Sequence, residues 1–143
     1  MKEYICAAAG AAGGFIATLL GGWDTGLQTL LIFMAVDYLT GLIVAGVFHK
    51  SNKTENGALE SKAGFKGICR KGVILLIVLV AYRFDLMIHT NYIRDAVMIA
   101  FISNEAISIT ENAGLMGVPM PKKLKLAIEI LTKKSEEMED EKY

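Results

Sequence analysis

The sequence predicts an all-α integral membrane protein with four transmembrane helices arranged as two hairpins, followed by a short amphipathic C-terminal helix. Three observations lead to this prediction. Of the 143 residues, 53% are hydrophobic and 21% are charged, and the formal net charge is zero. The charges largely avoid four apolar stretches. The basic residues gather between the second and third stretches and again after the fourth.

The composition also excludes several classes of protein. Intrinsically disordered chains are poor in apolar residues, whereas this chain is rich in them. Two cysteines are too few for a disulfide-stabilised scaffold. A chain with no excess of positive charge is not expected to bind nucleic acid. We therefore expect membrane lipid, rather than nucleic acid, as the medium in which the chain works.

The first two apolar stretches have the length of membrane spans. Residues 4–23 carry no charge, and residues 25–48 carry only Asp37. Twenty helical residues extend roughly 30 Å, which is the thickness of a bilayer's hydrocarbon core. A signal peptide is the alternative for the first stretch. Against it, Lys2 is offset by Glu3, and the small residues precede the bulky ones.

The third and fourth stretches, residues 72–88 and 94–111, are shorter or interrupted by charge. The third reaches its full length only by including Arg83 and Asp85, and the fourth contains Glu105. A buried helix of a soluble core is the alternative for apolar runs of this length. Three spans plus a re-entrant or interfacial helix is therefore the alternative fold.

The distribution of basic residues predicts the topology. Residues 49–71 form a basic loop with six basic and two acidic residues, a net charge of +4, and the segment after Pro119 holds six lysines. The positive-inside rule places both segments, and hence both termini, in the cytoplasm. Near the membrane, basic side chains attract anionic lipid headgroups. The headgroup-binding candidates are Lys62, Lys66, Arg70 and Lys71.

Small residues recur every four positions along the first predicted span. Gly10 and Gly14 have the GxxxG spacing that lets two membrane helices approach closely. The stripe predicts a helix–helix interface, within one chain or between chains. Chance is the alternative, because alanine and glycine are common in this segment. The interface candidates are Gly10, Gly14, Thr18 and Gly22.

Asp37 lies near the middle of the second predicted span. A charged side chain at that depth costs roughly 2.5–3.5 kcal/mol on insertion scales, so it should face another helix or water. It could line a pore, pair subunits, form a structural pair with Arg83 or Arg94, or stay protonated and hydrogen-bonded. The sequence leaves these interpretations open.

The fourth predicted span has a polar stripe that hydrocarbon would not solvate. It contains Asn104, Ser108 and Glu111, with Glu105 and Asn112 beside them. In an assembly of several chains this face could line a lumen. Alternatively, it could pack against the loop or the tail of its own chain. With Asp37, the pore candidates are Asn104, Glu105, Ser108 and Glu111.

The C-terminal part begins with a helix break over residues 112–121, which contains both prolines of the chain. Residues 122–143 then predict an amphipathic helix on the inner membrane surface and a charged cytoplasmic tail. No nucleotide-binding loop, zinc-protease motif or paired CxxC occurs. His49 and His89 lie at opposite ends of different spans. We therefore expect no enzymatic activity, no metal and no cofactor.

Three blocks in order give a resemblance to a known family. They are Asp37–Leu42, Ser61–Lys71 and Asn104–Ser108, followed by Glu111-Asn112 and by Gly117–Pro121. Together they resemble the phage-lysis and toxin-secretion holins of Gram-positive bacteria and their phages, over residues 30–131. The positions that match the family pattern are Asp37, Tyr38, Thr40, Gly41, Gly64, Gly67, Arg70, Asn104, Glu105, Glu111, Asn112, Pro119 and Pro121.

The resemblance implies a function that the residues alone do not show. Holins accumulate in the cytoplasmic membrane and then assemble suddenly into large lesions that release an endolysin or a large toxin. It thus implies a homo-oligomer, an endolysin or toxin as functional partner, and an antiholin as a further partner. The alternatives are a small transporter or ion channel subunit, or a membrane-anchored scaffold that recruits a cytoplasmic protein.

Overall fold

The computed structural model describes residues 1–141, which fold into helices without any β-strand. In chain order these are α1 (Lys2–Leu19), α2 (Thr25–Gly46), α3 (Ser61–Ile88), α4 (Ile93–Leu115) and α5 (Lys122–Asp140). The all-α prediction is confirmed. The last two residues of the predicted tail, Lys142 and Tyr143, lie outside the described residues.

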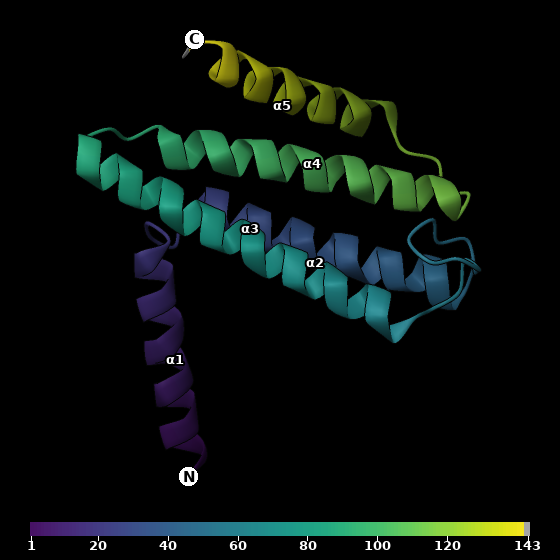
Figure 1. The fold of residues 1–143 in the computed structure, drawn as a ribbon, viewed down its shortest axis with the longest axis horizontal. Helices are drawn as coiled ribbons and strands as arrows, with labels where there is room; N and C mark the ends of the chain where they lie inside the picture. Colours follow the sequence, from purple (N-terminus) through teal and green to yellow (C-terminus); the bar gives the residue numbers. More distant parts are fainter. Residues whose placement is uncertain (142–143) are drawn as a thin grey trace.

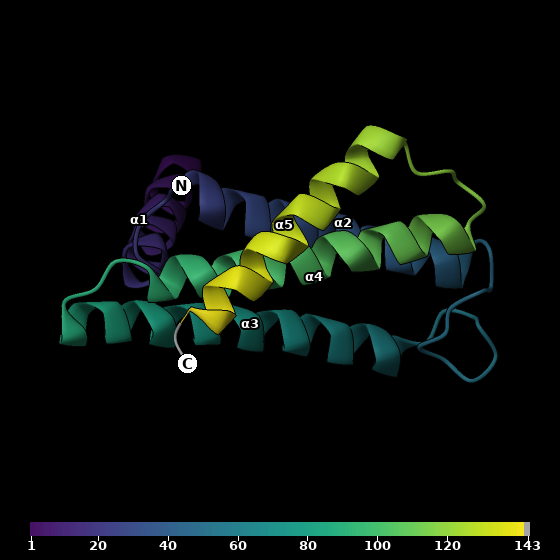
Figure 2. The same ribbon diagram turned by 90° about the horizontal axis from the view of Figure 1, so that it is seen from above.

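Helix α4 is the centre of the fold. It packs against α2, α3 and α5, whereas α2 and α3 touch each other only lightly. Figures 1 and 2 show α2, α3 and α4 running back and forth along one long axis, with α5 crossing over α4. The 47–60 and 116–121 connections consequently lie at the same end of this bundle.

The core between α2, α3 and α4 is made of aliphatic side chains. Leu27, Leu30 and Met34 of α2 meet Val78 of α3, together with Met98 and Ile102 of α4. Leu30 and Val78 are fully buried. Each such side chain contributes about 1.5–3 kcal/mol when it is transferred out of water. This packing accounts for the bundle but leaves much of its outer surface apolar.

Helix α1 does not form the predicted hairpin with α2. It projects away from the bundle in Figure 1, and none of its residues is buried. The direction of the chain changes through Gly21 and Gly22, whose φ angles of 96° and 105° suit glycine. Helix α2 buries its inner face on α4 instead, because α4 supplies the large side chains that fill that interface.

Two predicted boundaries differ from the structure. The basic segment 49–71 is not all loop, because α3 begins at Ser61, and the break expected from residue 112 begins only after Leu115. Lysine and arginine are good helix formers, so the charged residues extend α3 rather than end it. The chain turns at Gly117, whose φ is 76°.

One helix within residues 1–141 is long and apolar enough to cross a membrane by length and composition, namely α2, with a mean hydropathy of 1.9. The four predicted spans are therefore not confirmed. Large apolar side chains are also exposed along the outside of α3, among them Val73, Leu76, Val80 and Phe84. Extended apolar surface of this kind is typical of a protein that meets lipid or another protein.

Helix α5 forms as predicted but is not free to lie on a membrane surface in this structure. It packs along α4, and the hydroxyl oxygens of Thr132 and Ser103 are 2.7 Å apart. The residues of α5 that turn toward α4 recur at helical spacing, and its outer face carries most of its charges. They are Ile128, Leu131, Thr132, Ser135 and Met138.

The end of the bundle next to α1 is held together by Arg94. Its guanidinium donates to both carboxylate oxygens of Asp24, at 2.5 and 3.3 Å, to the carbonyl of Gly22 at 3.1 Å, and to the carbonyl of Leu20. Asp24 also accepts the Leu27 N–H at 2.9 Å and so caps the start of α2. One arginine therefore ties the α1–α2 turn to α4.

A second carboxylate fixes the neighbouring turn from α3 into α4. Asp85 accepts the backbone N–H groups of Ile93 and Arg94, at 3.0 and 2.9 Å, and the Thr90 hydroxyl at 2.6 Å. Asp85 thus satisfies the first N–H groups of α4, which have no partner within the helix. The chain enters α4 in an orientation that aims Arg94 at Asp24.

We predict that Arg94→Met lowers the stability of the bundle by about 2 kcal/mol, because hydrogen bonds to a charged group are worth about 1.5–3 kcal/mol. Thermal unfolding in detergent, followed by circular dichroism, measures the change. The matched control is Arg83→Met, since Arg83 is exposed and has no ion pair within residues 1–141. Equal stability losses in the two variants would contradict the anchoring role of Arg94.

A pH dependence follows from the same contact. The hydrogen bond from Arg94 lowers the pKa of Asp24 below its ordinary value of 3.8. The ionised Asp24 therefore adds stability at pH values above 3.8, and this contribution disappears as the pH falls through the lowered pKa. In Asp24→Asn, which keeps the helix cap, the stability deficit relative to the native chain should shrink over that acidic range. A deficit that is constant with pH would argue against the ion pair.

Candidate functional site

A charged cluster lies inside the bundle, where α2, α3 and α4 meet. The Lys71 ammonium on α3 is 2.8 Å from Oδ2 of Asp37 on α2 and 2.7 Å from Oε2 of Glu105 on α4. The two carboxylate side chains are only 7% and 6% exposed. A single lysine thus joins three helices through two short ion pairs.

An amide and a hydroxyl complete the cluster. The side-chain nitrogen of Asn112 on α4 lies 3.1 Å from Oδ1 of Asp37, 3.2 Å from the Asp37 carbonyl and 2.9 Å from the Thr40 hydroxyl. Thr40 in turn donates to carbonyls one turn back in α2. We call Asp37, Thr40, Lys71, Glu105 and Asn112 the central polar cluster.

The electrostatics of this cluster explain why it is buried. An unpaired ion inside a protein or a bilayer is strongly disfavoured, but a paired and hydrogen-bonded ion is tolerated. Lys71 serves two carboxylates, and Asn112 supplies a further donor to Asp37. Removing the single cation would leave two acids facing each other in an apolar bundle.

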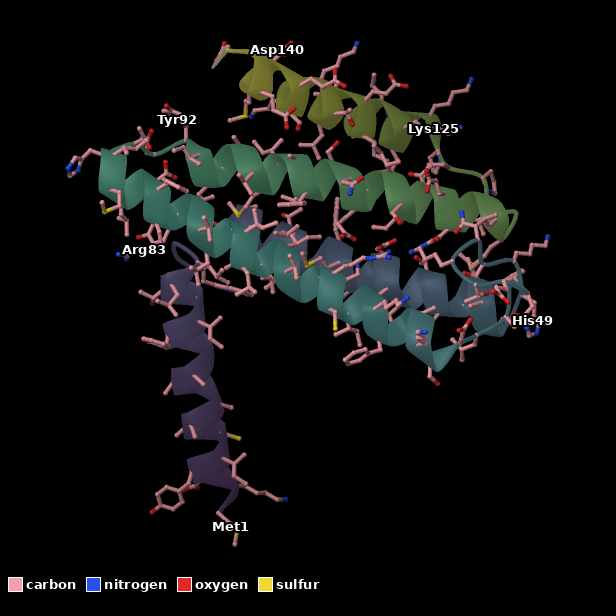
Figure 3. All side chains as sticks on the ribbon, in the orientation of Figure 1. Met1, His49, Arg83, Tyr92, Lys125 and Asp140 are labelled. Carbon is pink, nitrogen blue, oxygen red and sulfur yellow. The ribbon has the colours of Figure 1, made fainter. Side chains whose placement is uncertain are left out.

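One of the interpretations left open for Asp37 was an ion pair with Arg83 or Arg94, and the structure does not show that pair. Neither Arg83 nor Arg94 reaches Asp37, because Arg94 binds Asp24 at the α1 end of the bundle. Figure 3 shows Arg83 near that same end, opposite His49. The partner is Lys71, one of the residues predicted to bind lipid headgroups. Lys71 instead turns into the bundle, whereas Lys62, Lys66 and Arg70 are exposed.

The polar stripe predicted on α4 divides between two environments. Glu105 and Asn112 are buried and belong to the central polar cluster. Glu111 and Asn104 are exposed, and Ser108 is half-buried. The buried part of the stripe contacts its own chain, but through Asp37 and Thr40 of α2 and Lys71 of α3 rather than through the loop or the tail that the alternative named.

The small-residue stripe on α1 has no neighbour in this structure. A side chain added at Gly10 or Gly14 would meet nothing within 4 Å. Thr18 donates to the carbonyl of Gly14 at 2.8 Å, within the helix. Gly22 lies beyond Leu19, where α1 ends, so it does not share the stripe. The predicted interface at Gly10, Gly14 and Thr18 therefore remains a prediction.

A cavity of about 580 Å³ opens above the central polar cluster. Helices α2, α3 and α4 form its walls, the 47–60 connection forms its rim, and Asp37, Glu105 and Lys71 line its floor. Basic side chains line the mouth together with two glutamates. These are Lys53, Lys62, Lys66 and Arg70, with Glu55 and Glu60.

The light contact between α2 and α3 beside this cavity depends on glycine. Tyr38 of α2 donates its hydroxyl to the Gly64 carbonyl at 3.4 Å. A Cβ on Gly64 would lie 3.3 Å from the tyrosine oxygen, and a Cβ on Gly67 would lie 3.6 Å from the ring. Tyr38, Gly64 and Gly67, which the resemblance singled out individually, form one contact in the structure.

The arrangement offers little for metal binding within residues 1–141. No group of three or more histidine, cysteine, aspartate or glutamate side chains there is placed to hold a metal ion. Cys6 and Cys69 are exposed and free. The acids that do come together are already bound by Lys71 and Asn112, so their chemistry is that of a structural ion pair.

The fold is a helical bundle with charges paired inside and large apolar side chains outside, an arrangement typical of helical membrane proteins. Within that class, residues 14–133 match the bacteriophage holin family. The chain belongs to this family. Family membership indicates a cytoplasmic membrane protein that works without enzymatic chemistry.

Similar proteins occur in bacteria and in a phage. An uncharacterized protein of Listeria monocytogenes is 40% identical over 129 residues, covering 90% of this chain and 86% of that protein. An uncharacterized 14.9 kDa protein of Clostridium perfringens is 40% identical over 124 residues, 85% of this chain and 88% of its own. A protein of Bacillus phage phi105 named "Probable holin" is 32% identical over 96 residues, 66% and 65% of the two chains. No solved structure matches the chain.

We predict that Lys71→Met destabilises the bundle by about 3 kcal/mol, because it leaves two buried carboxylates without their cation. Arg70→Met is the matched control, since Arg70 is the adjacent residue and is exposed. Adding Asp37→Asn and Glu105→Gln to Lys71→Met should recover most of the loss. Unfolding midpoints in detergent measure all three variants against the native chain. Failure of the neutral triple variant to recover stability would contradict the electrostatic explanation.

Proposed function

We propose that this protein is a holin: it homo-oligomerises in the bacterial cytoplasmic membrane and forms a large, non-selective lesion that releases an endolysin or a large toxin. The observation that carries the proposal is membership of the bacteriophage holin family over residues 14–133. The phage relative named "Probable holin" adds support. A function carried by assembly needs no catalytic residue, and none is proposed.

The proposed topology keeps four spans with both termini in the cytoplasm. It is supported by the position of the two Lys-rich segments, since the 47–60 connection and the start of α5 lie at the same end of the bundle. The positive-inside rule assigns that end to the cytoplasm. In this topology Lys62, Lys66 and Arg70 stand where anionic headgroups begin.

The proposed oligomer interface is α1. Each of its residues is exposed or nearly so, and its surface includes Tyr4, Ile5, Phe15 and Ile16 beside Gly10 and Gly14. A helix without partners in its own chain gains packing only from lipid or from another copy. Small residues let two helix backbones approach more closely than lipid tails can.

We predict that induced expression in a bacterium stops growth abruptly after a delay, and that a membrane-energy poison advances this moment. Gly10→Leu with Gly14→Leu should abolish or long postpone the arrest by blocking close helix approach. Growth curves and release of a cytoplasmic enzyme are the measurements. Ala8→Leu with Ala12→Leu is the matched control, because it places the same leucine side chains on the opposite side of α1.

Several outcomes would count against the proposal. Steady growth at high membrane levels of the native chain would reject lesion formation. A saturable, ion-selective flux that is lost in Asp37→Asn, without growth arrest, would favour the small transporter or channel instead. Equal delays in the two leucine pairs would remove α1 as the interface while leaving the holin function in place.

A further inference from the structure

The mouth of the cavity above the central polar cluster has an unusual electrostatic composition. Lys53, Lys62, Lys66 and Arg70 line it, and none of them forms an ion pair within residues 1–141. By contrast, Lys71 on the floor is fully engaged with two carboxylates. The mouth thus holds four unpaired cations against two glutamates, a net charge of +2, which is attractive to an anion.

One neutral side chain at the mouth also lacks a hydrogen-bond partner within residues 1–141. The Thr54 hydroxyl oxygen is buried at the lining of the cavity, and no hydrogen bond to it is present. Buried hydroxyls in proteins are normally satisfied, so an unpaired one calls for an explanation. Glu60, the residue before α3, makes no side-chain cap. The first N–H groups of α3 therefore contribute their positive partial charge to the same region.

A second, shallower hollow on α3 shares part of its lining with the cavity. This groove, of about 590 Å³, is lined by Phe65, Cys69 and Val73 together with three residues that also line the cavity. The shared residues are Lys66, Arg70 and Ile74. Phe65 and Val73 are 69% and 52% exposed. An anion-attracting mouth and an apolar groove therefore meet at two basic side chains.

We infer that this composite hollow binds one anionic phospholipid of the inner leaflet. The phosphate lies among Lys62, Lys66 and Arg70 and accepts a hydrogen bond from the Thr54 hydroxyl. One acyl chain follows the groove past Phe65 and Val73. A phosphate group matches both lysine and arginine donors, and the acyl chain covers the exposed apolar row. A free phosphate would fill the mouth but not the groove.

The inference rests on the proposed membrane topology, which puts this end of α3 at the cytoplasmic surface. The inference goes beyond the general attraction of a basic segment to anionic lipids, because it places one lipid at one defined site. Long-range attraction of a basic segment depends on its total charge, whereas a built site depends on which residues carry the charge. The two glutamates at the mouth, Glu55 and Glu60, offset part of its positive charge, so the arrangement of the basic residues matters more than their number.

The test is native mass spectrometry of the full chain, extracted in detergent from vesicles of equal parts phosphatidylglycerol and phosphatidylcholine. One retained phosphatidylglycerol per chain is the expected result. Lys66→Gln with Arg70→Gln should weaken retention at least about tenfold, and Thr54→Val about threefold. Lys122→Gln with Lys123→Gln removes the same charge from exposed residues outside the cavity and should leave retention unchanged.

The outcomes separate the alternatives. Equal losses in the two glutamine pairs, or equal retention of both lipids, would overturn the discrete site. Bound inorganic phosphate with no retained lipid would assign the mouth to free phosphate and also overturn it. Leakage of dye-filled vesicles reports lesion formation separately. Lipid retention without leakage would uphold the site and reject the proposed function, and leakage without retention would do the reverse.

Discussion

The contact of Lys71 with Asp37 and Glu105 governs how the rest of the bundle is arranged. A buried lysine needs a carboxylate, and a buried carboxylate needs a cation or several donors. Because the three residues come from α2, α3 and α4, their pairing sets the depth at which each helix stands relative to the others. Aliphatic packing between the helices would tolerate a shift of one turn, whereas two ion pairs of under 3 Å would not. The cluster supplies the register, and the core supplies most of the stabilisation.

The charged residues also fall into three groups along the length of the bundle. Arg94 closes the end next to α1, the central polar cluster occupies the middle, and unpaired lysines gather at the other end. Each buried ion is paired or hydrogen-bonded by groups close to it in the same part of the bundle. The basic end gathers several exposed cations without an ion pair within residues 1–141 around one cavity. It is also the end at which a membrane headgroup layer can satisfy them.

The sequence predicted the helices well and their partners poorly. The apolar periods and the glycine and proline breaks are local, so the helical class, α2 and the amphipathic α5 could be derived from them. The partner of Asp37 depends on the order in which helices pack, which no local pattern encodes. Lys71 is the last cation before the apolar part of α3. From the sequence, its side chain could reach toward the membrane surface or turn into the bundle. Its position alone did not distinguish lipid headgroups from the acids of α2 and α4.

The position of α5 bears on whether α4 can span a membrane, because α5 packs along α4 in this structure. Its outer face is charged, and charged side chains are strongly disfavoured in hydrocarbon. The structure nevertheless places α5 along α4, held by apolar side chains and the Ser103–Thr132 hydroxyl pair. Wherever α4 crosses a bilayer, α5 must leave it, and the face of α4 that α5 covers then needs another partner. That face belongs to the helix that organises the bundle, so a copy of the same chain could replace α5 without disturbing the central polar cluster on the opposite side.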